Sequence, residues 1–368
     1  MAEKKSKQGI EVWVGTKKGT FVFRSNDRKT WKISGPEFKG WEVNHVVQDP
    51  RDPKRYYAAV NSAWFGPHIH ASADGGKTWA LSEQGLAVEG LGEVAGKPAT
   101  LARIWHIHPG HADEPGVVYA GADPGVLFRS RDWGATWNVV DGITRHATRG
   151  QWSPGAGGMM IHSISALGKG RLIVGASACG AFRSSDGGET WEPFNQGVLA
   201  DFRPDKFPEV GQCVHKLLAH PRKPEALYQQ NHCGVYKAKL NGKKWTDISK
   251  GLPTRFGFGL AVPAAEEETL FTVPMDSPAY RCNMNGKLSV ARSRDGGKTW
   301  KLLNKGLPPH NAHVTVLREA MTSDPLSPAG VYFGTSTGTV YHTRNSGDAW
   351  HTLAANLPPV YSVTVAQQ

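Results

Sequence analysis

Five histidines in this sequence are spaced so that they could assemble a metal centre. Each lies near the start of a short segment in which apolar and polar residues alternate, a pattern typical of β-strands. The five are His45, His106, His162, His215 and His313. Neutral imidazole is a ligand for divalent transition metals. If the five segments are equivalent strands of one fold, their imidazoles converge, and the sequence then predicts a site for Fe, Cu, Zn or Mn.

Three or four of the five imidazoles would bind the metal in such a site, and an open coordination position would face the substrate. Two structural interpretations stay open beside this one. The histidines could descend from one duplicated segment, or each imidazole could hydrogen-bond the main chain of a neighbouring repeat and serve packing alone. Use of the imidazoles as acid–base or anion-binding groups without a metal also stays open.

The strands that would position these histidines belong to a repeat marked by a turn that ends in tryptophan. Its clearest copies are Ser72–Trp79, Ser184–Trp191 and Ser293–Trp300. Weaker copies are Ser25–Trp31, Ser130–Trp137, Ala238–Trp245 and Thr343–Trp350. Successive terminal tryptophans lie 48 to 58 residues apart, which suits one four-stranded propeller blade per repeat. Aspartate can hydrogen-bond its own turn, glycine supplies positive φ, and tryptophan packs between blades, so these aspartates are assigned to folding.

The sequence therefore predicts an all-β fold, a single seven-bladed β-propeller over residues 9–368 with a disordered tail over residues 1–8. The first blade has only three strands before Ser34. We expect the C-terminal segment Val360–Val365 to supply its innermost strand and to close the ring without an exposed sheet edge. The long connections are expected to cover the mouth of the central channel. These connections are residues 80–104, 141–159 and 192–212.

The turn repeat resembles the BNR or Asp-box repeat of sialidases, sortilin-type receptors, some xyloglucan-degrading enzymes and photosystem II assembly factors. The resemblance covers almost the whole chain and implies the propeller fold. It implies little about activity, because the shared residues are those of the turns and one fold hosts many functions.

Composition and charge exclude several other classes of protein. The formal charge is +11, but Lys and Arg are spread along the chain without a base-reading motif, so nucleic acid is not an expected partner. The charged N-terminus has no apolar leader, and no run of roughly 18 apolar residues occurs, so we expect a cytoplasmic protein without membrane contact. The four cysteines are too few for a disulfide scaffold and are expected to be thiols.

Other side chains are expected at the same mouth of the channel. His232 is a candidate base, and Arg281 and Tyr361 belong to the two blades that lack an axial histidine. These three are the candidate catalytic residues. Side chains that could stack on or hydrogen-bond a substrate are Trp64, Phe65, Arg103, Trp105, Gln230 and Asn231.

The function predicted from these residues is that of a metal-dependent enzyme acting on a small organic molecule at the channel mouth, by hydrolysis or by oxidation. One alternative is a sialidase-like glycoside hydrolase. Sialidases use an arginine triad, an Arg-Ile-Pro signature and a tyrosine nucleophile with a glutamate partner. The first blade lacks that signature, and the residues nearest to the other roles are Arg103, Arg281, Tyr361 and Glu209. Nor does the sequence place two carboxylates at the mouth as an acid and base pair. The other alternative is a non-enzymatic binding scaffold, and the oligomeric state stays open.

Overall fold

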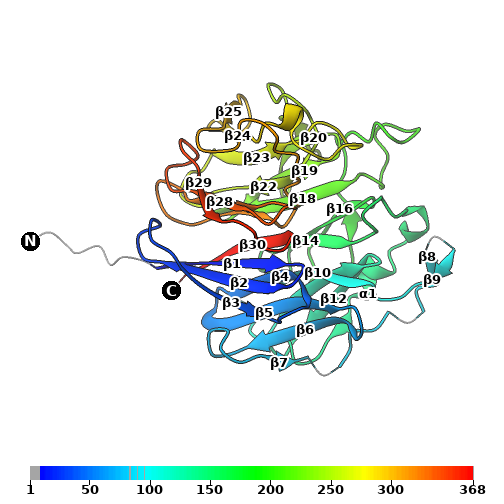
Figure 1. Cartoon of the computed structure of the whole chain (residues 1–368). Coiled ribbons are helices and arrows are strands. Elements are labelled where there is room, and N and C mark those ends of the chain that lie inside the picture. The colour runs from blue at the N-terminus through cyan, green and yellow to red at the C-terminus, as the bar shows by residue number, and fades with distance from the viewer. Residues whose placement is uncertain (1–8, 83, 89, 95, 368) are drawn as a thin grey trace, which may run out of the picture.

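Seven four-stranded antiparallel sheets make up the chain and surround a central axis as the blades of a ring (Figure 1). The computed structural model describes residues 9–82, 84–88, 90–94 and 96–367. The predicted fold, an all-β, single seven-bladed β-propeller, is confirmed. Residues 1–8, predicted to be a tail, lie outside the described residues.

Strand order in each blade runs from the axis outward. The innermost strands are β4 (Glu42–Asp49), β10 (Arg103–Pro109), β14 (Ile161–Ala166), β18 (Val214–His220), β22 (Gly257–Ala261), β26 (Met321–Ser323) and β30 (Val360–Gln367). The second strands are β5 (Asp52–Ser62), β11 (Val118–Asp123), β15 (Leu172–Ala176), β19 (Lys223–Asn231), β23 (Leu270–Pro274), β27 (Val331–Gly334) and β1 (Ile10–Thr16). The third strands are β6 (Gly66–Ser72), β12 (Val126–Ser130), β16 (Gly180–Ser184), β20 (Gly234–Lys239), β24 (Val290–Ser293), β28 (Val340–Thr343) and β2 (Gly19–Ser25). The outermost strands are β7 (Ala80–Leu81), β13 (Asn138–Val139), β17 (Glu192–Pro193), β21 (Thr246–Asp247), β25 (Lys301–Leu303), β29 (His351–Ala354) and β3 (Lys32–Glu37).

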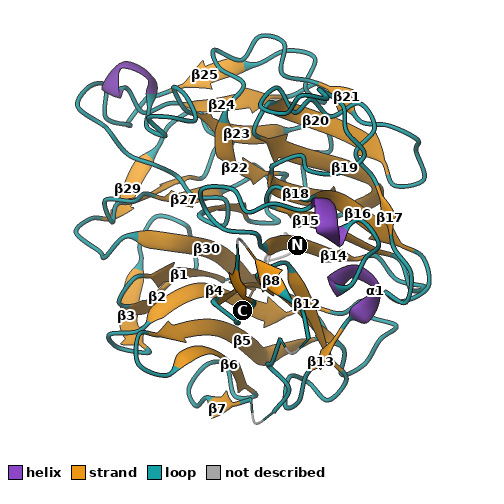
Figure 2. Ribbon diagram, turned by 90° about the vertical axis from the view of Figure 1, so that its right-hand side faces the viewer, coloured by secondary structure: helices purple, strands orange, loops and turns teal. Residues whose placement is uncertain are grey.

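The remaining regular elements are short and lie in the connections between strands of the blades (Figure 2). They are the ribbon of β8 (Glu93–Val94) and β9 (Lys97–Pro98), helix α1 (Asp141–Thr144), and single 3-10 turns at Arg149–Gln151 and Met284–Gly286. Within the described part of the chain, no helix has the length and apolar character needed to span a membrane.

The ring closes through pairing of β30 with β1, which lie side by side in red and blue in Figure 1. The register runs antiparallel from Ile10 opposite Gln367 to Thr16 opposite Val360. The strand order of this blade, β3-β2-β1-β30, confirms that the C-terminal segment supplies its innermost strand.

The Asp-box turns are held by hydrogen bonds that each aspartate makes within its own turn. Asp74 Oδ1 accepts from the backbone N–H of Lys77 and of Thr78, both at 3.0 Å. Its Oδ2 accepts from the Thr78 hydroxyl at 2.7 Å, and Gly76 adopts a φ of 79°. The same aspartate-to-threonine pattern recurs at Asp132, Asp186 and Asp295. These carboxylates are therefore occupied in holding hairpin turns, as predicted.

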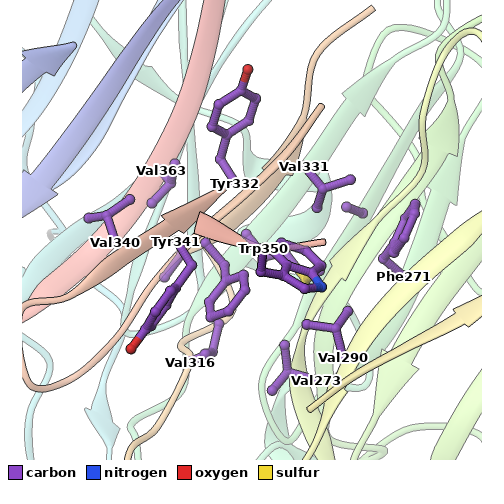
Figure 3. Packing of buried hydrophobic residues seen from close by; sticks show 14 of the residues in the cluster. Phe271, Val273, Val290, Val316, Val331, Tyr332, Val340, Tyr341, Trp350 and Val363 are labelled. Carbon is purple, nitrogen blue, oxygen red and sulfur yellow. The ribbon is translucent and has the colours of Figure 1, made fainter. Parts of the chain in front are cut away.

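The tryptophans that end these turns pack between neighbouring blades. Trp350 is 2% exposed, and its ring centroid lies 5.1 Å from that of Phe333 in its own blade. Figure 3 shows it among Phe271 and Val290 of the preceding blade. Such aromatic burial between sheets holds adjacent blades at a fixed angle and so fixes the innermost strands around the axis.

Candidate functional site

Six of the seven innermost strands carry a β-bulge close to the end where the strand begins. We call the face on which these ends lie the mouth. The bulge residues, which have no partner on the second strand, are Asn44, Trp105, His162, His215, Phe258 with Gly259, and Tyr361. A bulge inserts an extra residue and reverses the face to which later side chains point. In the remaining blade a turn precedes the innermost strand, β26. The Ala320 N–H closes this turn by donating to the Leu317 carbonyl at 3.0 Å.

The bulges correct the sequence alignment of the five histidines. His162 and His215 are themselves bulge residues, whereas His45 and His106 each follow one. His313 precedes β26 and is exposed. The prediction that all five occupy one equivalent position is therefore wrong, because a one-residue bulge shifts the register of the residues that follow it.

Both bulge histidines hydrogen-bond the main chain of the next blade. His162 Nε2 donates to the Val214 carbonyl at 2.9 Å, and His215 Nδ1 donates to the Gly257 carbonyl at 2.6 Å. The bulge residue Asn44 makes the same kind of link through its amide. Burial lowers the pKa of both imidazoles well below the ordinary histidine value, so they are neutral. These side chains satisfy backbone groups on the axial edge of each sheet, which is the packing role that the sequence left open.

Four buried side chains meet across the axis, and we call them the axial cluster: His45, His106, Lys216 and Glu319. Lys216 Nζ donates to Glu319 Oε2 at 2.6 Å, and His106 Nδ1 and His45 Nε2 lie 3.3 and 3.8 Å from the same oxygen. The two imidazole centroids are 4.4 Å apart. Although burial opposes ionisation, the Lys216 ammonium holds the pKa of Glu319 well below its usual range. The cluster lines a cavity of 230 Å³ that extends away from the mouth.

Ligand atoms of His45, His106 and Glu319 in the axial cluster lie within 4.8 Å of one another, but the His45 imidazole is not poised to bind a metal. His45 Nδ1 accepts the backbone N–H of Ile107 at 3.3 Å, so its neutral ring carries the proton on Nε2, the nitrogen nearer to Glu319. A ligating nitrogen needs a free lone pair instead. Lys216 also supplies the positive charge beside the carboxylate. The cluster is a buried ion pair flanked by two neutral imidazoles.

A second cavity, of 290 Å³, opens at the mouth, and we call it the mouth pocket. The side chains that define it are His215, His232, Phe256, Phe258, Arg281 and Arg318. Two of the connections expected to cover the mouth contribute to it, through residues 155–158 and through Phe202. The pocket therefore brings together two predicted catalytic residues, His232 and Arg281, but not Tyr361.

Three residues of the mouth pocket could hold a transition metal. Ligand atoms of Cys213, His215 and His232 lie within 4.8 Å of one another. Because the Nδ1 proton of His215 is donated to Gly257, its Nε2 carries a lone pair, the tautomer that metal-bound imidazoles adopt. Burial lowers the pKa of His232 and raises that of the Cys213 thiol, and all four cysteines are free.

Two carboxyl groups lie near one arginine at the rim of the mouth. Tyr361 donates its hydroxyl to Glu42 Oε1 at 3.3 Å, and Arg103 Nη2 lies 3.9 Å from Glu42 Oε2. Arg103 also faces Asp123 across the β10–β11 ladder, and its guanidinium lies 5.3 Å from the Trp105 ring. Burial raises the pKa of Asp123 above that of an ordinary aspartate. Burial and Glu42 together raise the pKa of Tyr361 to about 12.

The other predicted substrate-binding residues divide into exposed and buried groups. Trp64 and Phe65 are 90% and 73% exposed on the β5–β6 connection, and the Phe65 ring stacks 6.2 Å from that of Trp41. Gln230 and Asn231 are buried. The Gln230 amide donates to the Asn231 carbonyl at 2.9 Å, and the Asn231 amide is bonded within the same strand. The amide groups of these two residues are thus engaged inside the protein.

Several charged residues near the axis are not indicated by the sequence pattern. They are Glu42, Asp123, Lys216, Arg318 and Glu319. The last two lie beyond the segment at His313 that the pattern predicts as the innermost strand, whereas the strand begins at Met321. The carboxylate beside Tyr361 is that of Glu42, and Glu209, the partner considered from the sequence, is exposed.

Sequence comparison finds no matching family model but several curated relatives. The chain is 28% identical over 309 residues to a xyloglucanase from Paenibacillus sp, which covers 76% of this chain and 28% of the relative. It is 26% identical over 295 residues to a xyloglucanase from Hypocrea jecorina (strain QM6a), covering 71% of this chain and 32% of the relative. The chain thus spans less than a third of the length of these two curated relatives.

Comparison with solved structures shows the same fold in proteins of low sequence identity. The GH74 xyloglucanase from Xanthomonas campestris has a TM-score of 0.65 and 18% identity, covering 96% of this chain and 52% of the other. The structure of YCF48 bound to D1 peptide has a TM-score of 0.53 and 14% identity, covering 84% and 85%. At such identities the likeness concerns the propeller alone.

Proposed function

We propose that this chain is a glycoside hydrolase that cleaves a polysaccharide at the mouth, with Asp123 as general acid and Glu42 as the second carboxylate. The observation that carries the proposal is that both carboxyl groups adjoin Arg103. Glycoside hydrolysis needs two carboxyl groups whose surroundings assign them different protonation states.

Asp123 has the surroundings of the acid. It ends β11 and is partly buried at the base of the rim, and this burial raises the pKa of its carboxyl group. A carboxylic acid that keeps its proton can donate it to the oxygen of the leaving sugar. A water molecule or carboxylate must then act at the anomeric carbon.

Glu42 has the surroundings of a carboxylate. Its Oε1 accepts the Tyr361 hydroxyl, and its Oε2 faces the Arg103 guanidinium. Both contacts orient the group and suit a negative charge. Glu42 can thus activate water or attack the anomeric carbon itself, according to its distance from the acid when substrate is bound.

Exposed aromatic rings beside Glu42 provide a surface for sugar rings. Trp41 precedes Glu42 in the chain and stacks with Phe65, next to the exposed Trp64. Aromatic faces pair with the apolar faces of sugars, and a row of them suits a chain of sugars better than a small molecule. The names of the curated relatives, all xyloglucanases, also favour a polysaccharide over the small organic molecule predicted from the histidines.

Two assays test the proposal: release of reducing ends from xyloglucan and other β-glucans, and release of the fluorophore from a fluorogenic sialoside. Glu42→Gln and Asp123→Asn are each expected to lower kcat on the active glucan at least about a hundredfold. Asp276→Asn, which alters an exposed carboxylate in a connection at the mouth, serves as the control and keeps its rate. Release of sugar from none of the glucans, or unchanged rates in both rim variants, would contradict the proposal, and cleavage of the sialoside alone would favour the sialidase-like alternative.

A further inference from the structure

We propose that the mouth pocket binds the carboxylate of an acidic sugar between the guanidinium groups of Arg318 and Arg281. Both side chains line the cavity. The anion site is independent of the hydrolysis proposed above, whereas its assignment to a sugar of a glycan rests on that function.

Arg318 is a poorly exposed cation without a counter-ion. Within the described part of the chain, its guanidinium is in no ion pair, its buried Nε has no hydrogen-bond partner, and its Nη1 donates to the Met160 sulfur at 3.5 Å. Arg28, Arg51 and Arg292, which are also poorly exposed, each contact an aspartate. A buried charge without a partner is costly, so the guanidinium of Arg318 at the pocket indicates a ligand that supplies the missing anion.

The pocket adds a second cation and contributes no acid of its own. Arg281 lines the pocket, and its Nε donates to the Pro278 carbonyl at 3.0 Å. That hydrogen bond does not involve the two Nη nitrogens of Arg281. Among the described residues that line the cavity, none is an aspartate or a glutamate. Glu319, which adjoins Arg318 in sequence, is already paired with Lys216. The field inside the pocket is therefore positive.

Aromatic rings hold Arg318 in place before any ligand arrives. Its guanidinium lies 5.8 Å from the centroid of Trp105 and 5.4 Å from that of Phe258. Contacts with ring faces leave the edge of the guanidinium, which carries the N–H donors, available for a planar anion. A carboxylate matches that edge with two parallel hydrogen bonds.

The remaining lining fits a single sugar ring better than an inorganic ion. The cavity of 290 Å³ lies at the lower end of the size of small-molecule sites and has phenylalanine side chains at Phe256 and Phe258. His215 Nε2 carries a lone pair and can accept a sugar hydroxyl, because its Nδ1 proton is donated to Gly257. Apolar faces, hydroxyl acceptors and paired cations together describe a hexuronate.

Calorimetric titration of the full chain with glucuronate, glucose, sulfate and phosphate tests the proposal. Wild-type protein is expected to bind glucuronate at least about tenfold more tightly than glucose, and Arg318→Met and Arg281→Met are each expected to lose about tenfold or more. Arg294→Met removes an exposed positive charge in an Asp-box turn and is expected to bind as the wild type does. If Arg318→Met fails to fold, two other variants give the same comparison. They are Arg281→Met and Arg318→Lys, and the second keeps the positive charge but loses the two parallel N–H donors of the guanidinium.

The outcomes separate this proposal from the proposed hydrolysis. Glucuronate binding that persists in Glu42→Gln, in a protein that cleaves no glucan, supports the anion site and contradicts only the hydrolase. Equal affinity for glucose and glucuronate, or unchanged glucuronate binding in both arginine variants, overturns the anion site. Sulfate or phosphate binding as tight as glucuronate binding overturns the assignment to a sugar.

Discussion

His215 in one blade donates its Nδ1 proton to the carbonyl oxygen of Gly257 in the next blade, at 2.6 Å. A carbonyl can only accept, so the Nε2 of this neutral ring carries a lone pair and faces the mouth pocket. Two other buried histidines differ, because His162 has both nitrogens engaged and His45 holds its proton on Nε2. This one contact between blades thus fixes the tautomer of the His215 imidazole.

If the native protein binds a metal at the mouth pocket instead of a sugar, that binding is expected to depend on His215. Protein purified without a polyhistidine tag is analysed for Fe, Cu, Zn and Mn, together with His215→Gln and His313→Gln. The first variant is expected to lose bound metal because it removes the free lone pair, and the second to keep it because His313 is exposed and lies outside the pocket. A metal-free native protein would refute the metal cofactor, and metal retained in His215→Gln would refute this choice of ligand.

The pH dependence of hydrolysis is expected to reveal the acid. Asp123 must be protonated to act, so activity is present below its folded pKa and falls as pH rises through that value, which burial places above the ordinary aspartate value of 3.8. An aryl glycoside with a good leaving group needs no proton donor. On that substrate Asp123→Asn should retain most of its rate, whereas on the polysaccharide the same variant should lose most of its rate. An equal loss of rate on both substrates would count against the assignment.

Removing one partner of the axial ion pair is expected to cost more stability than removing both. Lys216→Met leaves the buried Glu319 carboxylate unpaired and should lower the free energy of unfolding by about 3–5 kcal/mol. The double variant Lys216→Met with Glu319→Leu should recover most of that loss. Urea unfolding of the wild type, both single variants and the double variant measures the coupling, and additive effects would show that the two side chains do not interact.

Acid is expected to destabilise the fold through buried neutral histidines such as His342. Its ring lies 5.5 Å from that of Trp31, and burial lowers its pKa to about 4 from an unfolded value near 6.5. Between these values the unfolded chain binds more protons, so stability is lost as pH falls from about 6.5 to about 4. From pH 7 to pH 5 the loss in unfolding free energy should be smaller in His342→Phe than in the wild type by up to about 2 kcal/mol. Equal losses in both proteins would contradict the depressed pKa.

Local residue chemistry made the fold predictable from the sequence. Aspartate, glycine and tryptophan act within one turn, so copies such as Ser72–Trp79 specify both the hairpin and its period without any knowledge of distant contacts. Closure by the C-terminal strand followed from the three strands of the first blade. The bulges did leave a signal in the sequence, because the apolar residues that pack in one cluster lie three positions apart across them, as Ile104 and Ile107 or Ile161 and Ile164 do.

The candidate site was only partly predictable because its contacts join distant segments. Tyr361 was identified, but its hydrogen bond to Glu42 spans 319 positions and forms only when the ring closes. Glu319 lies six positions beyond His313, and its approach to Lys216 depends on the turn before β26. A sequence pattern states which residues repeat, whereas these contacts join residues that differ from blade to blade.

The mouth pocket and the cavity of the axial cluster share no lining residue: Arg318 lines the first, whereas its neighbour Glu319, paired with Lys216, lines the second. The mouth pocket is therefore a separate cavity, and a ligand enters and leaves it at the mouth. A polymer can therefore offer the pocket only a free end or a side branch, while its backbone stays across the rim beside Glu42 and Arg103.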